Sequence, residues 1–134
     1  FTAGGAFPDV FSNMETYLAL SQAFEDTGVR AYKGQAGNLL MQGDVLEAAL
    51  QIHSVEARHA AEIRRIRGSK GWIVNAENTT AAAADPVYAG EDNIMQLGVD
   101  ATSVTEVDKA AVTEAYDEPL SEQAVLDIAS LFIQ

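Results

Sequence analysis

Two long amphipathic patterns, separated by a short turn, constrain the fold more than any other feature of this chain. Apolar residues recur at helical spacing over residues 13–37 and again over 44–68, which is typical of helices that bury one face. The residues between the two patterns are too few for anything but a tight connection. We therefore expect an antiparallel pair of long helices, as in a helical bundle.

Local signals mark the ends of both patterns. The spacing predicts a capping box at the start of each helix and a terminating glycine at the end of each. The predicted boxes are Ser12 with Glu15 and Asp44 with Glu47, and the glycines are Gly37 and Gly68.

A glutamate lies at the centre of each apolar stripe. Glu25 falls within the stripe of the first helix and Glu56 within that of the second, with His59 one turn further along the same face. Since Glu25 and Glu56 are equally far from the turn, their carboxylates are expected at the same height on adjacent helices. The stripes comprise Met14, Leu18, Val29, Tyr32 and Ala36, and Val45, Ala49, Ile52, Ala60 and Ile63. The opposite side of the first helix is expected to carry Glu15, Gln22, Asp26, Arg30 and Lys33. The opposite side of the second helix is expected to carry Glu47, Gln51, Ser54, Arg58 and Arg65.

Carboxylates in these positions need partners, because an ionised group is costly to bury unless it is paired or binds a metal. The chain has no cysteine, and oxygen ligands with one imidazole suit iron or manganese. We therefore predict Glu25, Glu56 and His59 as metal ligands. One Glu helix and one Glu-x-x-His helix are half of the ligand set of a di-metal four-helix bundle. The alternative is a metal-free hydrogen-bond network in which Tyr32 and His59 satisfy the carboxylates.

Other polar residues are given lesser roles. His53, at the edge of the second stripe, and Tyr32 are predicted to lie next to the ligands without binding the ions. The arginines of residues 64–67 are interpreted as favourable charges at a helix C-terminus. Residues 91–93 are interpreted as a solvent-exposed acidic loop, and residues 78–80 spell a glycosylation sequon.

The second half of the chain differs in composition. Residues 1–69 carry eight acidic and six basic side chains, whereas residues 70–134 carry twelve acidic and two basic. This acidity makes nucleic acid an unsuitable partner, and no apolar stretch is long enough to span a membrane. The loss of helical periodicity predicts a mostly irregular extension with a short helix at about 104–115. Another helix, at about 121–133, is expected to dock on the bundle.

Several blocks of the sequence agree, in order, with one known family. They are residues 17–32 (YLALSQAFEDTGVRAY), 48–68 (AALQIHSVEARHAAEIRRIRG), 87–93 (VYAGEDN) and 114–129 (EAYDEPLSEQAVLDIA). They resemble the bacterial ferritin-like domain proteins grouped with desiccation-related proteins. The resemblance implies an all-α, ferritin-like four-helix bundle. It also implies metal ligands at Glu25, Glu56 and His59 and a centre of two iron or manganese ions.

The chain departs from that family in its extent. Members resemble full bundles in which another Glu helix and another Glu-x-x-His helix precede the segment seen here. We therefore expect residues 1–68 to form the second half of a bundle, with a crossover at 1–12, and residues 69–134 to form the extension. The missing helices would come from the N-terminal half as a separate chain or from a second copy in a homodimer. The first is favoured, because the resemblance points to a longer parent chain.

The expected function follows from the same resemblance. It implies a di-metal redox protein in oxidant or stress protection or in iron handling, with a ferroxidase- or catalase-like activity as the enzymatic form. The alternative is a metal-free structural or stress-protective protein that keeps the bundle, because fold alone does not choose between them. The family and the non-methionine start favour an exported protein.

Overall fold

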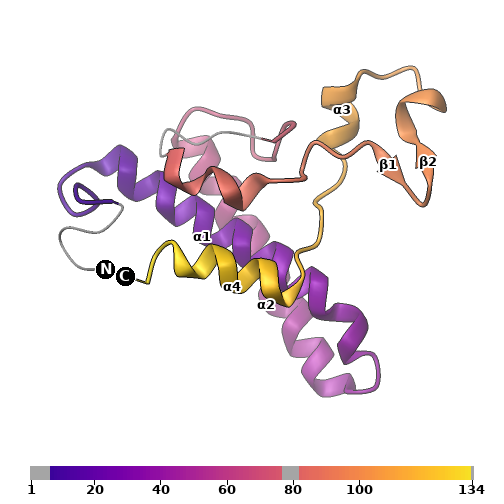
Figure 1. Ribbon diagram of the computed structural model, residues 1–134, viewed down its shortest axis with the longest axis horizontal. Helices are drawn as coiled ribbons and strands as arrows, with labels where there is room; N and C mark the ends of the chain where they lie inside the picture. Colours follow the sequence, from indigo (N-terminus) through magenta and orange to yellow (C-terminus); the bar gives the residue numbers. More distant parts are fainter. Residues whose placement is uncertain (1–6, 77–81, 134) are drawn as a thin grey trace.

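The computed structural model describes residues 7–76 and 82–133 (Figure 1). Half of the predicted crossover, residues 1–6, and the sequon at 78–80 lie outside the described residues. The centre of the fold is the pair of long helices α1 (Met14–Gln35) and α2 (Gly43–Ile66), which are joined through the short 3-10 segment η1 (Ala36–Leu39). The predicted all-α fold built on a long helical hairpin is confirmed.

The start of α1 is capped by Asn13 and not, as predicted, by Ser12. The Asn13 side-chain oxygen accepts hydrogen bonds from the backbone amides of Glu15 and Thr16, whereas the Ser12 hydroxyl donates to the carbonyl of Asp9. Asn and Ser are equally favoured at helix starts. The sequence alone therefore does not separate these two neighbouring positions.

The predicted capping box at the start of α2 is wrong. Within the described chain the N-cap residue that precedes this helix, Gln42, makes no side-chain capping bond, and Asp44 lies inside the first turn. The predicted end is confirmed at Gly68, where φ is +80°, a conformation that only glycine adopts freely. In α1 the helix ends before Gly37, which lies within η1.

The rest of the chain forms a layer against α1 and a lobe beyond it (Figure 1). Its elements are η2 (Ala82–Tyr88), β1 (Met95–Gln96), β2 (Val99–Asp100), η3 (Ala101–Ser103), α3 (Lys109–Thr113) and α4 (Glu122–Ser130). The η2 and α4 segments pack on α1, while the antiparallel β1–β2 pair and α3 lie in the lobe. The docked terminal helix is as predicted, with Ser121 accepting from the Ala124 amide. The helix expected at about 104–115 is shortened to α3.

The apolar core lies between α1 and this layer. Among the described residues its cluster draws on α1, η2 and α4 but contains no residue of α2. Aromatic rings close it, with Phe132 stacked on Phe7 at a centroid distance of 5.4 Å and tilted against Phe24 at 4.7 Å. The buried members are Phe7, Val10, Leu20, Ala23, Ile73, Ala84, Val87, Tyr88, Leu120, Ile128 and Phe132.

The middle of the polar side of α1 faces this layer and is buried, whereas Glu15 at its start is exposed. Gln22, Asp26 and Arg30, which we expected to lie away from the core, are all buried. The expectation was wrong because helical periodicity identifies an apolar stripe but does not show whether a second layer covers the other side.

Arg30 and Glu91 form a buried ion pair between α1 and the tail. Arg30 Nε lies 2.7 Å from Glu91 Oε1, and both side chains are almost completely buried. Burial raises the pKa of Glu91 to about 7, an effect that the charge of Arg30 opposes. The guanidinium also donates to the backbone carbonyls of Val87, Ala89 and Glu118. The interpretation of Glu91 as solvent-exposed is therefore wrong.

Asp26 and Arg64 form a second buried pair, which joins α1 to α2. Arg64 Nη2 lies 2.5 Å from Asp26 Oδ2, and the same oxygen accepts a 2.8 Å hydrogen bond from the hydroxyl of Tyr88. Gln22 donates to that hydroxyl and accepts a hydrogen bond from Arg67. Arg64 and Arg65 lie in the last turn of α2, as interpreted from the sequence, but Arg64 and Arg67 also bind side chains of α1.

Gly34 lets the tail cross α1 at close range. The amide of Leu120 donates to the carbonyl of Arg30, 3.1 Å away. A Cβ atom on Gly34 would overlap the carbonyl oxygen of Leu120. The obstacle is backbone, so it cannot move aside without displacing the segment that leads into α4.

Replacing Gly34 tests this crossing. Gly34→Ala should lower the free energy of unfolding by about 1–3 kcal/mol, the usual cost of overpacking, as measured by urea denaturation. It should also speed hydrogen exchange of the Leu120 amide. Gly37→Ala is the control, since no described atom lies within 4 Å of the added carbon. Equal unfolding free energies for the two variants would contradict the crossing.

Replacing Arg30 tests the ion pair. Arg30→Met leaves Glu91 buried without its charge partner and should cost about 3–5 kcal/mol of unfolding free energy. The double variant Arg30→Met/Glu91→Gln should recover part of that loss. Arg58→Met, on the exposed side of α2, is the control. A similar loss in both single variants would rule out a special role for the buried pair.

Candidate metal centre

The long helices bring the predicted ligands Glu25, Glu56 and His59 to one place. Glu25 Oε1 on α1 lies 3.3 Å from His59 Nδ1 on α2. Glu56 is close enough to both that their charges act on its carboxyl group. Along the two antiparallel helices, Glu25 lies opposite His59, and the Glu56 carboxyl lies opposite Gly28, one turn further along α1.

The electrostatics of the three groups are unbalanced at Glu56. Burial raises the pKa of the Glu56 carboxyl, the negative charge of Glu25 raises it further, and His59 opposes both. Glu56 Oε2 is buried and accepts no hydrogen bond from the described residues. By contrast, the Glu25 and His59 side chains are 28% and 57% exposed. The least satisfied oxygen is therefore the one that points between the helices.

These donors suit a metal ion chemically but form only part of a site. Two carboxylates and an imidazole are ligands that iron and manganese accept, and a buried oxygen without a protein partner is available to a cation. Over residues 7–76 and 82–133, however, no three His, Cys, Asp or Glu side chains are arranged to hold a metal ion by themselves. A complete centre would need further donors.

The two residues predicted to lie next to the ligands differ in position. Burial lowers the pKa of His53, as does the charge of Lys33, and Asp117 opposes them. His53 lies one turn before Glu56 on α2, and its Nε2 is buried without a hydrogen-bond partner among the described residues. Tyr32 is partly buried on α1, about two turns beyond Glu25.

Apolar side chains of the predicted stripes are exposed along both long helices, on a face that the described chain leaves open. Met14, Val45 and Ile52 belong to the predicted stripes, yet their side chains are 70%, 51% and 44% exposed. Ala49 and Ala60 of the same stripe are buried. The stripe thus continues past the contact between α1 and α2, and the exposed part has the composition of an interior.

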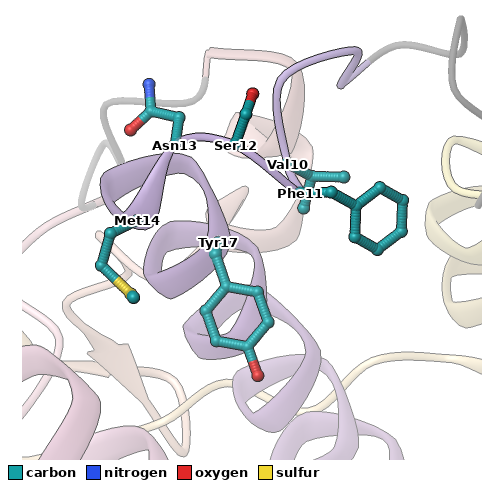
Figure 2. A pocket seen from close by; sticks show the side chains of 6 residues that line it. All are labelled: Val10, Phe11, Ser12, Asn13, Met14 and Tyr17. Atoms are coloured by element: carbon teal, nitrogen blue, oxygen red, sulfur yellow. The ribbon is translucent and has the colours of Figure 1, made fainter.

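A surface hollow of about 380 Å³ lies at the start of α1, away from these carboxylates. It is lined by Val10, Phe11, Ser12, Asn13, Met14 and Tyr17, whose side chains spread around the first turn of the helix (Figure 2). None of the six is acidic or a histidine. The rise of the helix from Tyr17 to Glu25 is about 12 Å, so the hollow is separate from the candidate centre.

Sequence reasoning missed the buried residues that orient the two ligand helices relative to each other. Asp26 directly follows Glu25, and its pairing with Arg64 fixes how α1 is rotated against α2. A signal was present, because Gln22, Asp26 and Arg30 are spaced four residues apart and form one polar line along α1. Such a line is equally typical of a solvated face.

The comparison with protein families matches the hairpin. Residues 6–69 match the family model described as a ferritin-like domain, a segment that contains Glu25, Glu56 and His59 and ends before the tail. Comparison with curated proteins and with solved structures gives no match. A search of the described helices finds none with the length and apolar character required to cross a membrane.

Glu56→Gln should raise the melting temperature of the metal-free protein at neutral pH. The folded state raises the Glu56 pKa above its ordinary 4.5, so ionisation is easier in the unfolded chain and costs stability as pH rises above that value. The advantage of the variant should therefore be absent below about pH 4.5 and grow above it, as measured by thermal unfolding in chelator. Glu62→Gln, exposed on the same helix, is the control. A variant that melts below the wild type at pH 7 would refute this account.

Proposed function

We propose that this chain supplies half of the ligand set of a carboxylate-bridged centre of two iron or manganese ions. Glu25 and Glu56 bridge or chelate the ions in this proposal, and His59 binds one of them. The observation that carries it is the convergence of these three side chains from adjacent helices, within the segment that matches the ferritin-like domain model. The buried and unpartnered Glu56 Oε2 supports it.

The remaining ligands come, in this proposal, from a second pair of helices. The exposed apolar side chains of the predicted stripes, including Met14, Val45 and Ile52, support such a partner. We favour the N-terminal half of the same bundle, because the family resemblance points to a longer parent chain. A second copy of this chain, paired about a two-fold axis, is the alternative.

The role we infer is protection against oxidants or stress, or iron handling, as in the bacterial and desiccation-related proteins that the sequence resembles. When bound, the ions supply the electron-transfer chemistry, while the protein supplies ligands and orientation. In this chain Glu25, Glu56 and His59 bind, and the Asp26–Arg64 pair holds the two helices in the rotation that directs them together.

A metal-free structural or stress-protective protein is the second candidate. It is favoured by the contact between Glu25 and His59, which gives each a partner within the chain. It is also favoured by the lack, across the described residues, of any three-ligand group. In this case the buried ionic contacts with the tail serve stability alone.

Metal binding by the purified protein separates the candidates. We expect anaerobic titration with Fe²⁺ or Mn²⁺ to show tight binding that Glu25→Ala, Glu56→Ala and His59→Ala each weaken by at least about tenfold, the range found for changes around metal ligands. Glu62→Ala should have no effect. Elemental analysis showing neither metal above background after loading would reject the di-metal proposal. Native mass spectrometry of the same material would show which partner completes the site.

A further inference from the structure

A glycine in the middle of α1 lies against the Glu56 carboxyl group. A Cβ atom on Gly28 would lie 2.5 Å from Glu56 Cδ, 2.5 Å from Oε1 and 2.6 Å from Oε2. These distances are far below the normal separation of non-bonded atoms. The carboxyl group therefore occupies the space that any other residue at position 28 would fill.

The helix itself gives no reason for glycine at this position. Gly28 lies well inside α1 and away from its caps, and its backbone does not have the left-handed φ that Gly68 requires. Glycine weakens the interior of a helix relative to alanine. Close approach of another group is the remaining reason, and the group that approaches is Glu56.

We infer that Gly28 is a positioning residue for Glu56, an inference that rests on the proposed di-metal function. Gly28 follows Glu25 by one turn on the same face of α1, so the space it leaves lies on the face that carries Glu25. Glu56 can then reach from α2 to the surface of α1 and present its oxygens next to those of Glu25. With a side chain at position 28, the Glu56 carboxyl is forced away from that place.

The nature of the obstacle predicts a selective effect. At Gly28 an added Cβ meets the end of a flexible side chain, whereas at Gly34 it meets the backbone of Leu120. Gly28→Ala should therefore move the Glu56 carboxyl and leave α1 and α2 folded. Metal affinity should fall while the fold persists.

A double-mutant cycle tests the inference on the intact protein as purified. The variants are Gly28→Ala, Glu56→Ala and both together, with Gly37→Ala as the matched control. Gly28→Ala should weaken Mn²⁺ binding by at least about tenfold, with unchanged circular dichroism, and should cause no further loss when Glu56 is already alanine. In chelator, the change in melting temperature caused by Gly28→Ala should be more favourable in the Glu56→Ala protein than in the wild type. In the Glu56→Ala protein the helix gains an alanine without a clash.

The two halves of the cycle keep this inference separate from the di-metal proposal. If wild type binds Mn²⁺ and Glu56→Ala weakens binding but Gly28→Ala does not, the positioning role is overturned. If wild type binds neither manganese nor iron, the di-metal proposal fails and the melting temperatures still decide. An effect of Gly28→Ala on melting that is the same with and without Glu56 would overturn the inference. If Gly28→Ala does not fold, the inference predicts that the double variant Gly28→Ala/Glu56→Ala does fold, because the clash is gone. A double variant that does not fold would also overturn the inference.

Discussion

The pairing of buried charges between α1 and its surroundings is the interaction on which the rest of the structure depends. An ionised group is costly to bury without a partner, and α1 buries both Asp26 and Arg30. Their partners lie on different parts of the chain, Arg64 on α2 and Glu91 in the tail. The acidic extension is therefore part of the bundle's structure, because its Glu91 neutralises a charge that α1 could not otherwise bury.

This pairing also determines where the candidate ligands point. Successive residues on a helix are rotated by about 100°, so fixing Asp26 against Arg64 directs Glu25 toward a different side of α1. Glu25 is consequently part-exposed beside Glu56 and His59, while Asp26 is buried against α2 and the tail. One helix thus carries a structural carboxylate, Asp26, and a candidate ligand, Glu25, in adjacent positions. The difference between them is that only Asp26 is buried and hydrogen-bonded to a tail residue, Tyr88.

The sequence was sufficient to predict features that depend on helical period and chain symmetry. These include the hairpin, the approach of Glu25 to the Glu-x-x-His face of α2, and the docked helix that follows Ser121. It was insufficient where a contact joins segments far apart in the chain. The burial of Arg30 depends on an irregular segment around Glu91, and no local period encodes that contact. Helix starts were misplaced for a smaller reason, since Ser12 and Asn13 are equally suitable caps.

Among the described residues, buried side-chain atoms without a hydrogen-bond partner occur at His53 and Glu56 on α2 and at Asp85 in the tail, and further features single out Glu56. The buried charges of Arg30 and Glu91 have close ionic partners, as expected of contacts that stabilise a fold. Glu56 has a buried oxygen without a described partner, a neighbouring negative charge, and a helix-weakening glycine that makes room for it. Each of these features opposes stability, and proteins usually violate such local rules at functional sites. A cation bound by the Glu56 carboxylate would account for all three features together, whereas a purely structural role for Glu56 would account for none of them.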